Sequence, residues 1–546
     1  MNASPTDTLS PSVHPAQEFV DPHAAVDQLT RIHQNAMKFL VGSYYECVDT
    51  VANQGQLPAA IRAYYPELRF TVSGIGEIDP SLSHGFVDRE GIYTATITRP
   101  VLFRKYLIEQ ISNLLANHGG SIEVRTSDTP IPLHMCRGYY TAASHAAATL
   151  VDPADVTAIE NLFTPIDSAA IDDTIADGEA DYLNLAAKPL SLFTAPRVDL
   201  ALQRLEHYTG ANAKHIQQFI LFTNYQLHTD VFLEYAQEVL NGQAVNGEAR
   251  NGEATDGSAG ENPSASPYTS LVCPGDQEYF AGDVPDAATC RQHAHHSQMP
   301  AYHLKRADNN GITIIDIGVG PSNAKTMTDC LAVLRPHCWI MVGHCAGLDR
   351  RMRIGDMILA NSYDRADQIL NGHVPLEKPI PPIAEIQQAI TQSLKTMMDL
   401  TDATVRQRLR TGTILTTNDR NWEWQSQRSI YRALQKSTAI GVEMESATIA
   451  TNGYRFRVPY GALLSVSDMP LHNKPKLPQT ARQFYNTTKK QHLHTAIHAC
   501  ELLADDPSQL HSRKLRRPVG GGGVPLTGVV KRENAYKLLD TPTGYR

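Results

Sequence analysis

The sequence predicts an α/β fold, with a large domain built on a mixed sheet and a smaller α+β domain in front of it. Beyond about residue 191, apolar stretches of strand length alternate with amphipathic helical stretches, which is typical of a sheet buried between helices. Before that point, the block 25–190 mixes helical and strand patterns. With 546 residues, of which 42% are hydrophobic and 19% charged, the chain has enough apolar side chains for two cores.

The first block, residues 25–190, contains two clear elements. Residues 99–119 (RPVLFRKYLIEQISNLLANHG) carry apolar side chains at helical spacing and end on a glycine, which predicts a helix. Residues 121–135 (SIEVRTSDTPIPLHM) predict a strand, a turn and an extended segment. Neither element holds a recognisable catalytic constellation.

The second block, residues 191–517, predicts an ordered series of strands and helices. We expect helices at 197–210 and 323–336, and a strand that leads into a helix at 439–456. We expect further strands within 215–226, 311–320, 338–348, 355–365, 410–420 and 460–470. Ligands of such sheets bind in the loops at the strand ends, so candidate site residues are sought there.

Three stretches differ in composition from these blocks. Residues 1–24 are polar and are expected to form a flexible lead, and residues 241–267 repeat NGEA and are expected to form a disordered insert. Residues 518–546 are expected to form a flexible basic tail. From residue 511 to the end there are eight Lys/Arg and two Asp/Glu. A basic tail either binds nucleic acid or is a solvated extension, and we favour the extension.

The overall charge argues against nucleic acid or an anionic membrane as the main partner, since the net charge is -9. No apolar stretch approaches the roughly 20 residues of a membrane helix, and the N-terminus is not a secretory signal.

The eight cysteines form no CxxC pair, so we expect a reduced, cytoplasmic protein without a bound metal. The segment HAHH at 293–296 lies beside the polar insert and is not expected to bind metal.

Two glycine-containing loops follow predicted strands. In residues 318–325 the glycines precede a helix, so backbone amides together with Ser322, Asn323 and Lys325 can bind an anion; a purely structural turn is the alternative. In residues 343–348, His344 or Cys345 can position water or an anion, and a tight turn with a packed thiol is the alternative. Adjacent residues of a strand point to opposite sides, which argues against a Cys/His nucleophile pair.

Carboxylates follow two other strands. Glu443 and Glu445 can accept hydrogen bonds from the vicinal hydroxyls of a sugar, while Met444 packs on its apolar face. The alternative is helix capping, since acidic residues are favoured at a helix start. Asp468 follows an apolar strand, next to Ser467, and burial there favours the protonated form that a general acid needs. The alternative is a simple turn before Met-Pro.

Taken in order, the strings GVG, GHCAGL, VEMESATIA and VSD resemble the ordered signature of the nucleoside phosphorylase and nucleosidase superfamily. Longer strings are similar to those of AMP nucleosidases. They are SDTPIPLH, TAPRVDLALQRLEHYTG, FILFTNYQ, IGVGPSNAKTMTDCLAVLRPH, RTGTILTTNDRNWE, EMESATIATNGYRFRVPYG, SDMPLH and HSRKLR. The resemblance covers residues from about 30 to 517 apart from the insert, and it implies a nucleoside phosphorylase-like catalytic domain behind a regulatory N-terminal domain.

The resemblance also implies a reaction, in which AMP and water give adenine and ribose 5-phosphate. Asp468 matches the acid that protonates the leaving base, with Ser467 beside it. Glu445 matches the ligand of the ribose hydroxyls, Met444 the residue under the sugar, and Glu443 a supporting member. Trp422 is a candidate for stacking on adenine, or else a core residue. Arg197 is a further candidate for binding the 5′-phosphate, in addition to the residues of the 318–325 loop.

The family further implies a homohexamer with no required cofactor, activated by MgATP and inhibited by phosphate, in purine nucleotide salvage and the control of adenylate levels. One departure concerns the nucleophile. Hexameric purine nucleoside phosphorylases carry an Arg two residues before the glycine of the second loop, where it binds the nucleophilic phosphate. In this sequence Met341 occupies that position before Gly343, and the loss of the charge favours water over phosphate as the nucleophile. The alternatives are a purine nucleoside phosphorylase and a non-catalytic AMP sensor.

Overall fold

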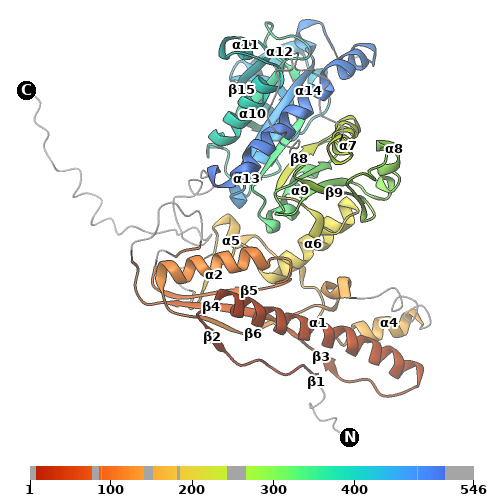
Figure 1. The fold of residues 1–546 in the computed structure, drawn as a ribbon, viewed down its shortest axis with the longest axis vertical. Coiled ribbons are helices and arrows are strands. Elements are labelled where there is room, and N and C mark those ends of the chain that lie inside the picture. The colour runs from red at the N-terminus through yellow and green to blue at the C-terminus, as the bar shows by residue number, and fades with distance from the viewer. Residues whose placement is uncertain are drawn as a thin grey trace, which may run out of the picture. The chain divides into compact units, whose positions relative to one another are not determined.

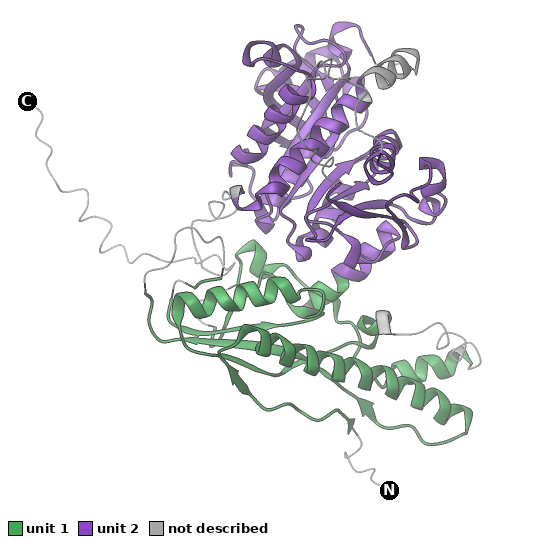
Figure 2. Ribbon diagram, viewed as in Figure 1, with its two compact units in different colours: residues 1–200, 517–546 green, residues 201–516 purple. Residues whose placement is uncertain are grey.

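The computed structural model describes residues 8–76, 85–87, 89–139, 152–180, 185–242, 266–475 and 478–510. It divides into two compact units, shown in Figure 2: unit 1 comprises residues 1–200 and 517–546, and unit 2 comprises residues 201–516. The division falls within helix α6 (Ala195–Thr209). Within the described residues, no helix combines the length and the apolar character that a membrane crossing requires.

Unit 1 is an α+β unit, as the sequence predicts. Its sheet has the order β2-β6-β4-β5-β7, with mainly antiparallel pairing. These strands are β2 (Gln17–Phe19), β4 (Tyr64–Val72), β5 (Gly91–Thr96), β6 (Ile122–Pro130) and β7 (Lys188–Pro189). Helices α1 (Pro22–Ala52) and α2 (Arg104–His118) pack against each other and against the sheet (Figure 1). The predicted helix at 99–119 and the strand expected within 121–135 are thereby confirmed. The turn and extended segment expected after that strand are wrong, because β6 continues to Pro130 and a short 3-10 helix begins at Leu133.

Helix α1 begins where Asp21 caps it, by accepting a hydrogen bond from the His23 amide, with Pro22 in the first turn. Its buried residues recur at helical spacing along the whole helix, so it contributes to two cores. The first half packs with β4, β6 and α2. The second half packs with β3 (Ala60–Ile61), η1 (Leu133–Tyr139) and α4 (Pro153–Glu160).

The polar lead differs from our expectation of a flexible segment. Of residues 1–24, the described part contains β1 (Thr8–Leu9), β2 and the start of α1. Strand β2 pairs antiparallel with β6, with Gln17 opposite Val124, and β1 pairs parallel with β3. A backbone that joins existing strand edges gains hydrogen bonds despite polar side chains, and composition alone does not reveal this.

Unit 2 contains a mixed sheet of ten strands in the order β10-β9-β11-β12-β8-β13-β16-β15-β14-β17. Strands β13 and β17 also pair with each other, so β13, β16, β15, β14 and β17 form a closed ring. The bounds are β8 (Phe219–Thr223), β9 (Tyr268–Cys273), β10 (Gln277–Phe280), β11 (Ala301–Arg306), β12 (Ile312–Asp316), β13 (Cys338–Gly347), β14 (Met357–Ala366), β15 (Leu409–Thr417), β16 (Ala439–Glu443) and β17 (Tyr460–Asp468). The strands predicted from the second block are all confirmed.

Helices cover this sheet (Figure 1). They are α7 (Gln226–Leu240), α8 (Ala287–Cys290), α9 (Pro321–Leu331), α10 (Ala384–Met397), α11 (Asp402–Arg408), α12 (Gln427–Leu434), α13 (Ser446–Phe456) and α14 (Pro478–Asp505). Helix α14 packs on α10, α7 and β17, while α9 packs on α13. All eight cysteines lie within the described residues as buried free thiols.

The insert predicted at 241–267 lies outside the described residues except for its first and last two positions, and the predicted tail 518–546 lies wholly outside them.

Candidate functional site

The candidate residues of unit 2 gather where several strands end. Asp316 at the end of β12 lies opposite Thr223 at the end of β8, and β8 pairs with β13 up to Met341. Further along β13, Ala346 lies between Asp468 of β17 on one edge and Val442 of β16 on the other. The loops after β8, β12, β16 and β17 therefore meet around the second half of β13.

The first loop turns on two glycines. Gly318 and Gly320 have φ angles of +64° and +115°, conformations that L side chains rarely adopt. The Gly318 amide donates to Asp316 Oδ1 at 3.0 Å, and a Cβ on Gly318 would lie 3.1 Å from Asn323 Nδ2. Helix α9 begins directly after this turn, so the unpaired backbone amides of its first turn lie at the end of this loop.

Glu445 joins this loop to the end of β8. Its Oε1 accepts from the Gly320 amide at 2.5 Å, and its Oε2 accepts from Asn224 Nδ2 at 3.0 Å. The side chain is only 1% exposed. Burial, together with the neighbouring Glu443, raises the pKa of Glu445, while the two hydrogen bonds oppose that rise. Each carboxylate oxygen keeps a further lone pair, so the group can still accept hydrogen bonds from a ligand.

Glu443 has a different environment, although it is only two residues away. Its Oε2 accepts from the amides of Glu445 and Ser446, each at 2.8 Å, and from the Ser446 hydroxyl at 2.9 Å. Its Oε1 accepts from the Thr416 hydroxyl, whose oxygen accepts from the Ala447 amide at 2.8 Å. Glu443 thus caps the start of α13, whereas Glu445 faces the loops. The helix-capping interpretation of this segment therefore applies to Glu443, and the ligand-binding interpretation is left to Glu445.

Asp468 and Ser467 lie at the end of β17. The Ser467 hydroxyl is 2.5 Å from Asp468 Oδ1 and 3.3 Å from the Cys345 carbonyl oxygen, and both side chains are buried. This hydroxyl fixes the orientation of the carboxyl group. Met444 is half-buried on the bend that joins β16 to α13.

The loop predicted at 343–348 is wrong, because β13 continues to Gly347. On this strand, His344 and Cys345 point in opposite directions. The His344 ring contacts Tyr225, His228 and His492, which belong to the region of α7 and α14. A Cβ added to Gly441 of β16 would lie 3.3 Å from Cys345 Sγ, so the thiol packs toward the strand ring. This arrangement agrees with the argument against a Cys/His nucleophile pair.

Two candidate cations already have partners. Lys325 forms an ion pair with Asp329 within α9. Arg197 lies in unit 1, where its Nε and Nη2 bond the two carboxylate oxygens of Asp173 at 2.9 and 3.4 Å. Its assignment to the 5′-phosphate stays a prediction. Ser322 is exposed and Asn323 half-buried in the first turn of α9.

Trp422 lies in the short helix η6 (Trp422–Trp424), which follows β15. Strand β15 runs parallel to β16, with Thr416 opposite Glu443, so this loop leaves the sheet beside the glutamate pair. Trp422 is half-buried, which argues against the alternative of a core tryptophan.

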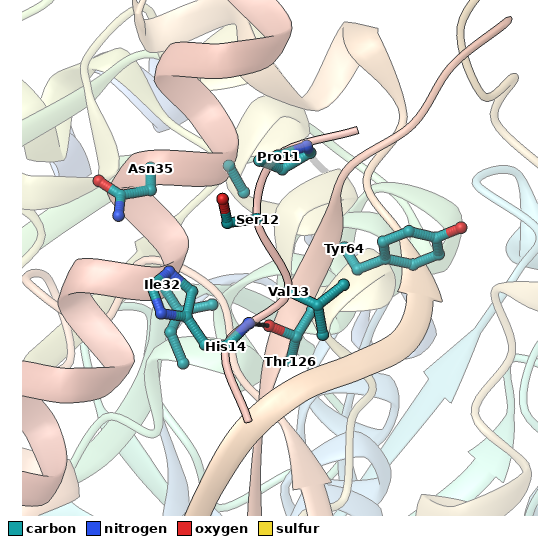
Figure 3. A pocket seen from close by; sticks show the side chains of 9 residues that line it. Pro11, Ser12, Val13, His14, Ile32, Asn35, Tyr64 and Thr126 are labelled. Atoms are coloured by element: carbon teal, nitrogen blue, oxygen red, sulfur yellow. Dashed lines mark hydrogen bonds between the residues drawn. The ribbon is translucent and has the colours of Figure 1, made fainter. Parts of the chain in front are cut away.

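A small pocket lies in unit 1, between the N-terminal segment, α1, β4 and β6 (Figure 3). Its lining consists of Pro11, Ser12, Val13, His14, Ile32, Asn35, Ala36, Tyr64 and Thr126. These residues include no Lys or Arg, so the pocket does not offer the cationic donors that a nucleotide phosphate needs.

The sequence did not reveal two residues that organise the site. Asn224 donates to Glu445, and Thr416 donates to Glu443. The signal for Asn224 was its place directly after the apolar strand FILFT, because polar residues at strand ends are candidates in such sheets.

Comparisons with known proteins agree with this architecture. Residues 24–185 match the family of the bacterial AMP nucleoside phosphorylase N-terminus, and residues 278–503 match the phosphorylase superfamily. AMP nucleosidase of Escherichia coli (strain K12) is 40% identical over 506 residues, which cover 91% of this chain and 96% of that protein. The chain belongs to the AMP nucleosidase family.

More distant relatives match parts of the chain. A 5′-methylthioadenosine/S-adenosylhomocysteine nucleosidase of Staphylococcus aureus (strain MRSA252) is 27% identical over 164 residues. The match covers 29% of this chain and 68% of that nucleosidase. Among solved structures, the AMP nucleosidase of Bacteroides thetaiotaomicron matches with 24% identity and a TM-score of 0.39, over 57% of this chain and 98% of that chain.

Proposed function

We propose that the chain hydrolyses the N-glycosidic bond of AMP to adenine and ribose 5-phosphate, in purine nucleotide salvage and the control of adenylate levels. The observation that carries this proposal is the 40% identity to an AMP nucleosidase along 91% of the chain. Asp468 at the end of β17 and Glu445 directly after β16 support it, since these two strands flank Ala346 of β13.

The roles of the residues follow from the charge that develops. Cleavage places positive charge on the ribose and negative charge on adenine. Asp468, oriented by Ser467, donates a proton to the leaving base, a contribution of roughly 10²–10⁴-fold to the rate. Glu445 accepts hydrogen bonds from the ribose hydroxyls while Gly320 and Asn224 hold its carboxylate. Met444 packs under the sugar, and Glu443 positions the segment by capping α13.

The 5′-phosphate binds at the turn that precedes α9. The amides at the start of this helix, with Ser322 and Asn323, supply neutral donors, and the helix dipole favours an anion there. Lys325 adds a cation one turn further on. Trp422 stacks on adenine from the loop after β15. His344 and Cys345 shape the wall beside Gly343.

Hydrolysis is favoured over phosphorolysis by the residue at 341. Met341 is 1% exposed and packs within the sheet, between Phe222 and Ala462 of the neighbouring strands. An uncharged, buried side chain at this position cannot bind a nucleophilic phosphate. A purine nucleoside phosphorylase remains the second candidate, and it requires phosphate for any release of base.

We further propose that the enzyme is a cytoplasmic homohexamer that needs no cofactor, with activation by MgATP and inhibition by phosphate acting through unit 1. The match of residues 24–185 to the N-terminal family supports a separate function for this unit. Deletion of residues 1–190 should remove the response to ATP, and an unchanged response would contradict this assignment.

The deciding experiment is a chromatographic product assay of the full-length protein with AMP, with and without phosphate and MgATP. We expect adenine and ribose 5-phosphate without phosphate. Strict dependence on phosphate, with ribose 1,5-bisphosphate as the second product, would instead indicate a phosphorylase. Binding of AMP by calorimetry with no adenine formed would indicate a sensor.

A further inference from the structure

Three imidazoles meet between the sheet and its helices in unit 2. His228 comes from the first turn of α7, His344 from β13 and His492 from α14. One ring nitrogen of each lies within 4.8 Å of the others, and the three residues are 0%, 7% and 0% exposed. The rings of His228 and His344 stack at 5.0 Å, and those of His228 and His492 meet edge to face at 5.3 Å.

The hydrogen bonds of His492 fix its tautomer. Its Nε2 lies 2.8 Å from the carbonyl oxygen of Leu463, which can only accept, so Nε2 carries the proton. Its Nδ1 has no hydrogen-bond partner among the described residues. A proton on Nδ1 would leave a buried donor unsatisfied, so Nδ1 presents a lone pair.

His228 has the complementary arrangement. Its Nδ1 lies 2.7 Å from Thr223 Oγ1, and its Nε2 has no hydrogen-bond partner among the described residues. A proton on Nε2 would again be an unsatisfied buried donor, which favours the tautomer with Nδ1–H donating to Thr223. In each of His228 and His492, one ring nitrogen therefore donates a hydrogen bond to an oxygen outside the cluster. The other ring nitrogen presents its lone pair to the cluster.

This is the pattern of metal-binding histidines, in which the second ring nitrogen donates to a neighbouring oxygen and so fixes the ring. We propose that His228, His344 and His492 bind a divalent transition-metal ion of the zinc class. Three imidazoles without a carboxylate suit zinc rather than magnesium or calcium. Tetrahedral zinc holds nitrogens about 3.4 Å apart, which small ring rotations achieve from the present spacing.

The ion would tie α7 and α14 to the second half of β13, which contains His344. This inference does not rest on the proposed reaction, because its test measures metal binding and unfolding rather than the products formed from AMP. Binding to the folded chain alone would also raise its unfolding temperature.

The test uses the full-length protein stripped of metal by chelation and titrated with Co²⁺ or Zn²⁺. We expect one ion per chain, a visible Co²⁺ absorption typical of low coordination, and a higher unfolding temperature with Zn²⁺. His228→Gln and His492→Gln should abolish these effects. Thr223→Val, which removes the outer hydrogen bond to His228 together with a longer one from the Tyr225 amide, should weaken affinity about 10–100-fold.

The exposed pair His295 and His296 provides the matched control, since their rings are also close, at 3.8 Å. The double variant H295Q/H296Q should keep the tight site. Loss of binding in this control, with binding retained in His492→Gln, would overturn the proposal, as would the absence of binding by the wild-type chain. X-ray absorption of the zinc-loaded wild type checks the ligands without any variant: three imidazoles are expected, and thiolate ligation would contradict the assignment.

Discussion

Replacement of Asn224 by alanine tests whether Glu445 is held in place by its neighbours. The Asn224 amide is one of two donors to a carboxylate that is 1% exposed, and the other donor is the Gly320 backbone amide. The substitution removes one donor and leaves the turn after β12 intact. Glu445 then keeps one of its two positioning bonds.

The magnitude follows from the burial of this pair. A hydrogen bond to a charged group contributes about 1.5–3 kcal/mol, and full burial of Glu445 means that water does not replace it. At about 1.4 kcal/mol for each factor of ten, kcat/KM for AMP should fall about 10–150-fold. The loss should appear mainly in KM if Glu445 binds the ribose in both the ground state and the transition state.

The pH profile gives a second readout with a defined sign. Burial raises the pKa of Glu445 and the bond from Asn224 lowers it, so removal of this bond raises the pKa further. Glu445 must be ionised to accept from the ribose hydroxyls. The acidic limb of kcat/KM should therefore move to higher pH in Asn224→Ala. It should move further still in Asn224→Asp, which places another carboxylate beside Glu445 in addition to Glu443.

Asn452→Ala is the matched control. Asn452 is also a buried asparagine, and its Nδ2 donates to Asp329 Oδ1 at 2.8 Å, between α13 and α9. Loss of the Asn452 amide should lower the unfolding temperature without moving the acidic limb of the kcat/KM profile. An unshifted limb with an unchanged KM in Asn224→Ala would refute the role of Glu445 as a ribose ligand held by Asn224.

Three further outcomes are expected. Asp468→Asn should lower kcat by roughly 10²–10⁴-fold in the chromatographic assay, and full activity would exclude an acid role. Trp422→Ala should raise KM for AMP by about 5–150-fold if stacking contributes about 1–3 kcal/mol, and an unchanged KM would exclude stacking. Asp199→Ala should destabilise unit 1 by about 3–5 kcal/mol in denaturant unfolding, because this buried carboxylate accepts from Tyr65, Thr98 and Arg99. Stability equal to that of the wild type would contradict that account.

Strands β8 and β12 to β17 of unit 2 were predictable because each is a short apolar run bounded by turn residues, whereas β9, β10 and β11 were not predicted. The segment 338–348, for example, corresponds to the observed strand Cys338–Gly347. The closed ring was not predictable, since it depends on the additional pairing of β13 with β17. Pairings of this kind join distant parts of the chain and leave no local signal.

The site was predictable by residue type and strand position, but not by partner. Glu443 and Glu445 are equivalent in the sequence, and their separate environments arise from Thr416 and from Asn224, which is 221 residues away from Glu445. The cluster of His228, His344 and His492 was likewise not predictable, because its members belong to three separate segments of the chain. The histidine-rich run at 293–296, which stands out in the sequence, lies elsewhere in unit 2.

The charges near α9 indicate how an acidic protein can bind an anionic nucleotide. The net charge is -9, and Lys325 is paired with Asp329. Asp329 also accepts from Asn452 and lies 3.4 Å from the Arg455 guanidinium, which is fully buried. Because these bonds remain when Lys325 turns away, the lysine can move to a phosphate without leaving Asp329 unpaired. In the proposed site, the ion pair with Asp329 keeps Lys325 from being an unpaired cation when no nucleotide is bound, and the amides of the glycine turn are the donors that do not have to move. Binding that depends on one exchangeable lysine and on neutral amides should vary less with ionic strength than binding by several unpaired surface cations.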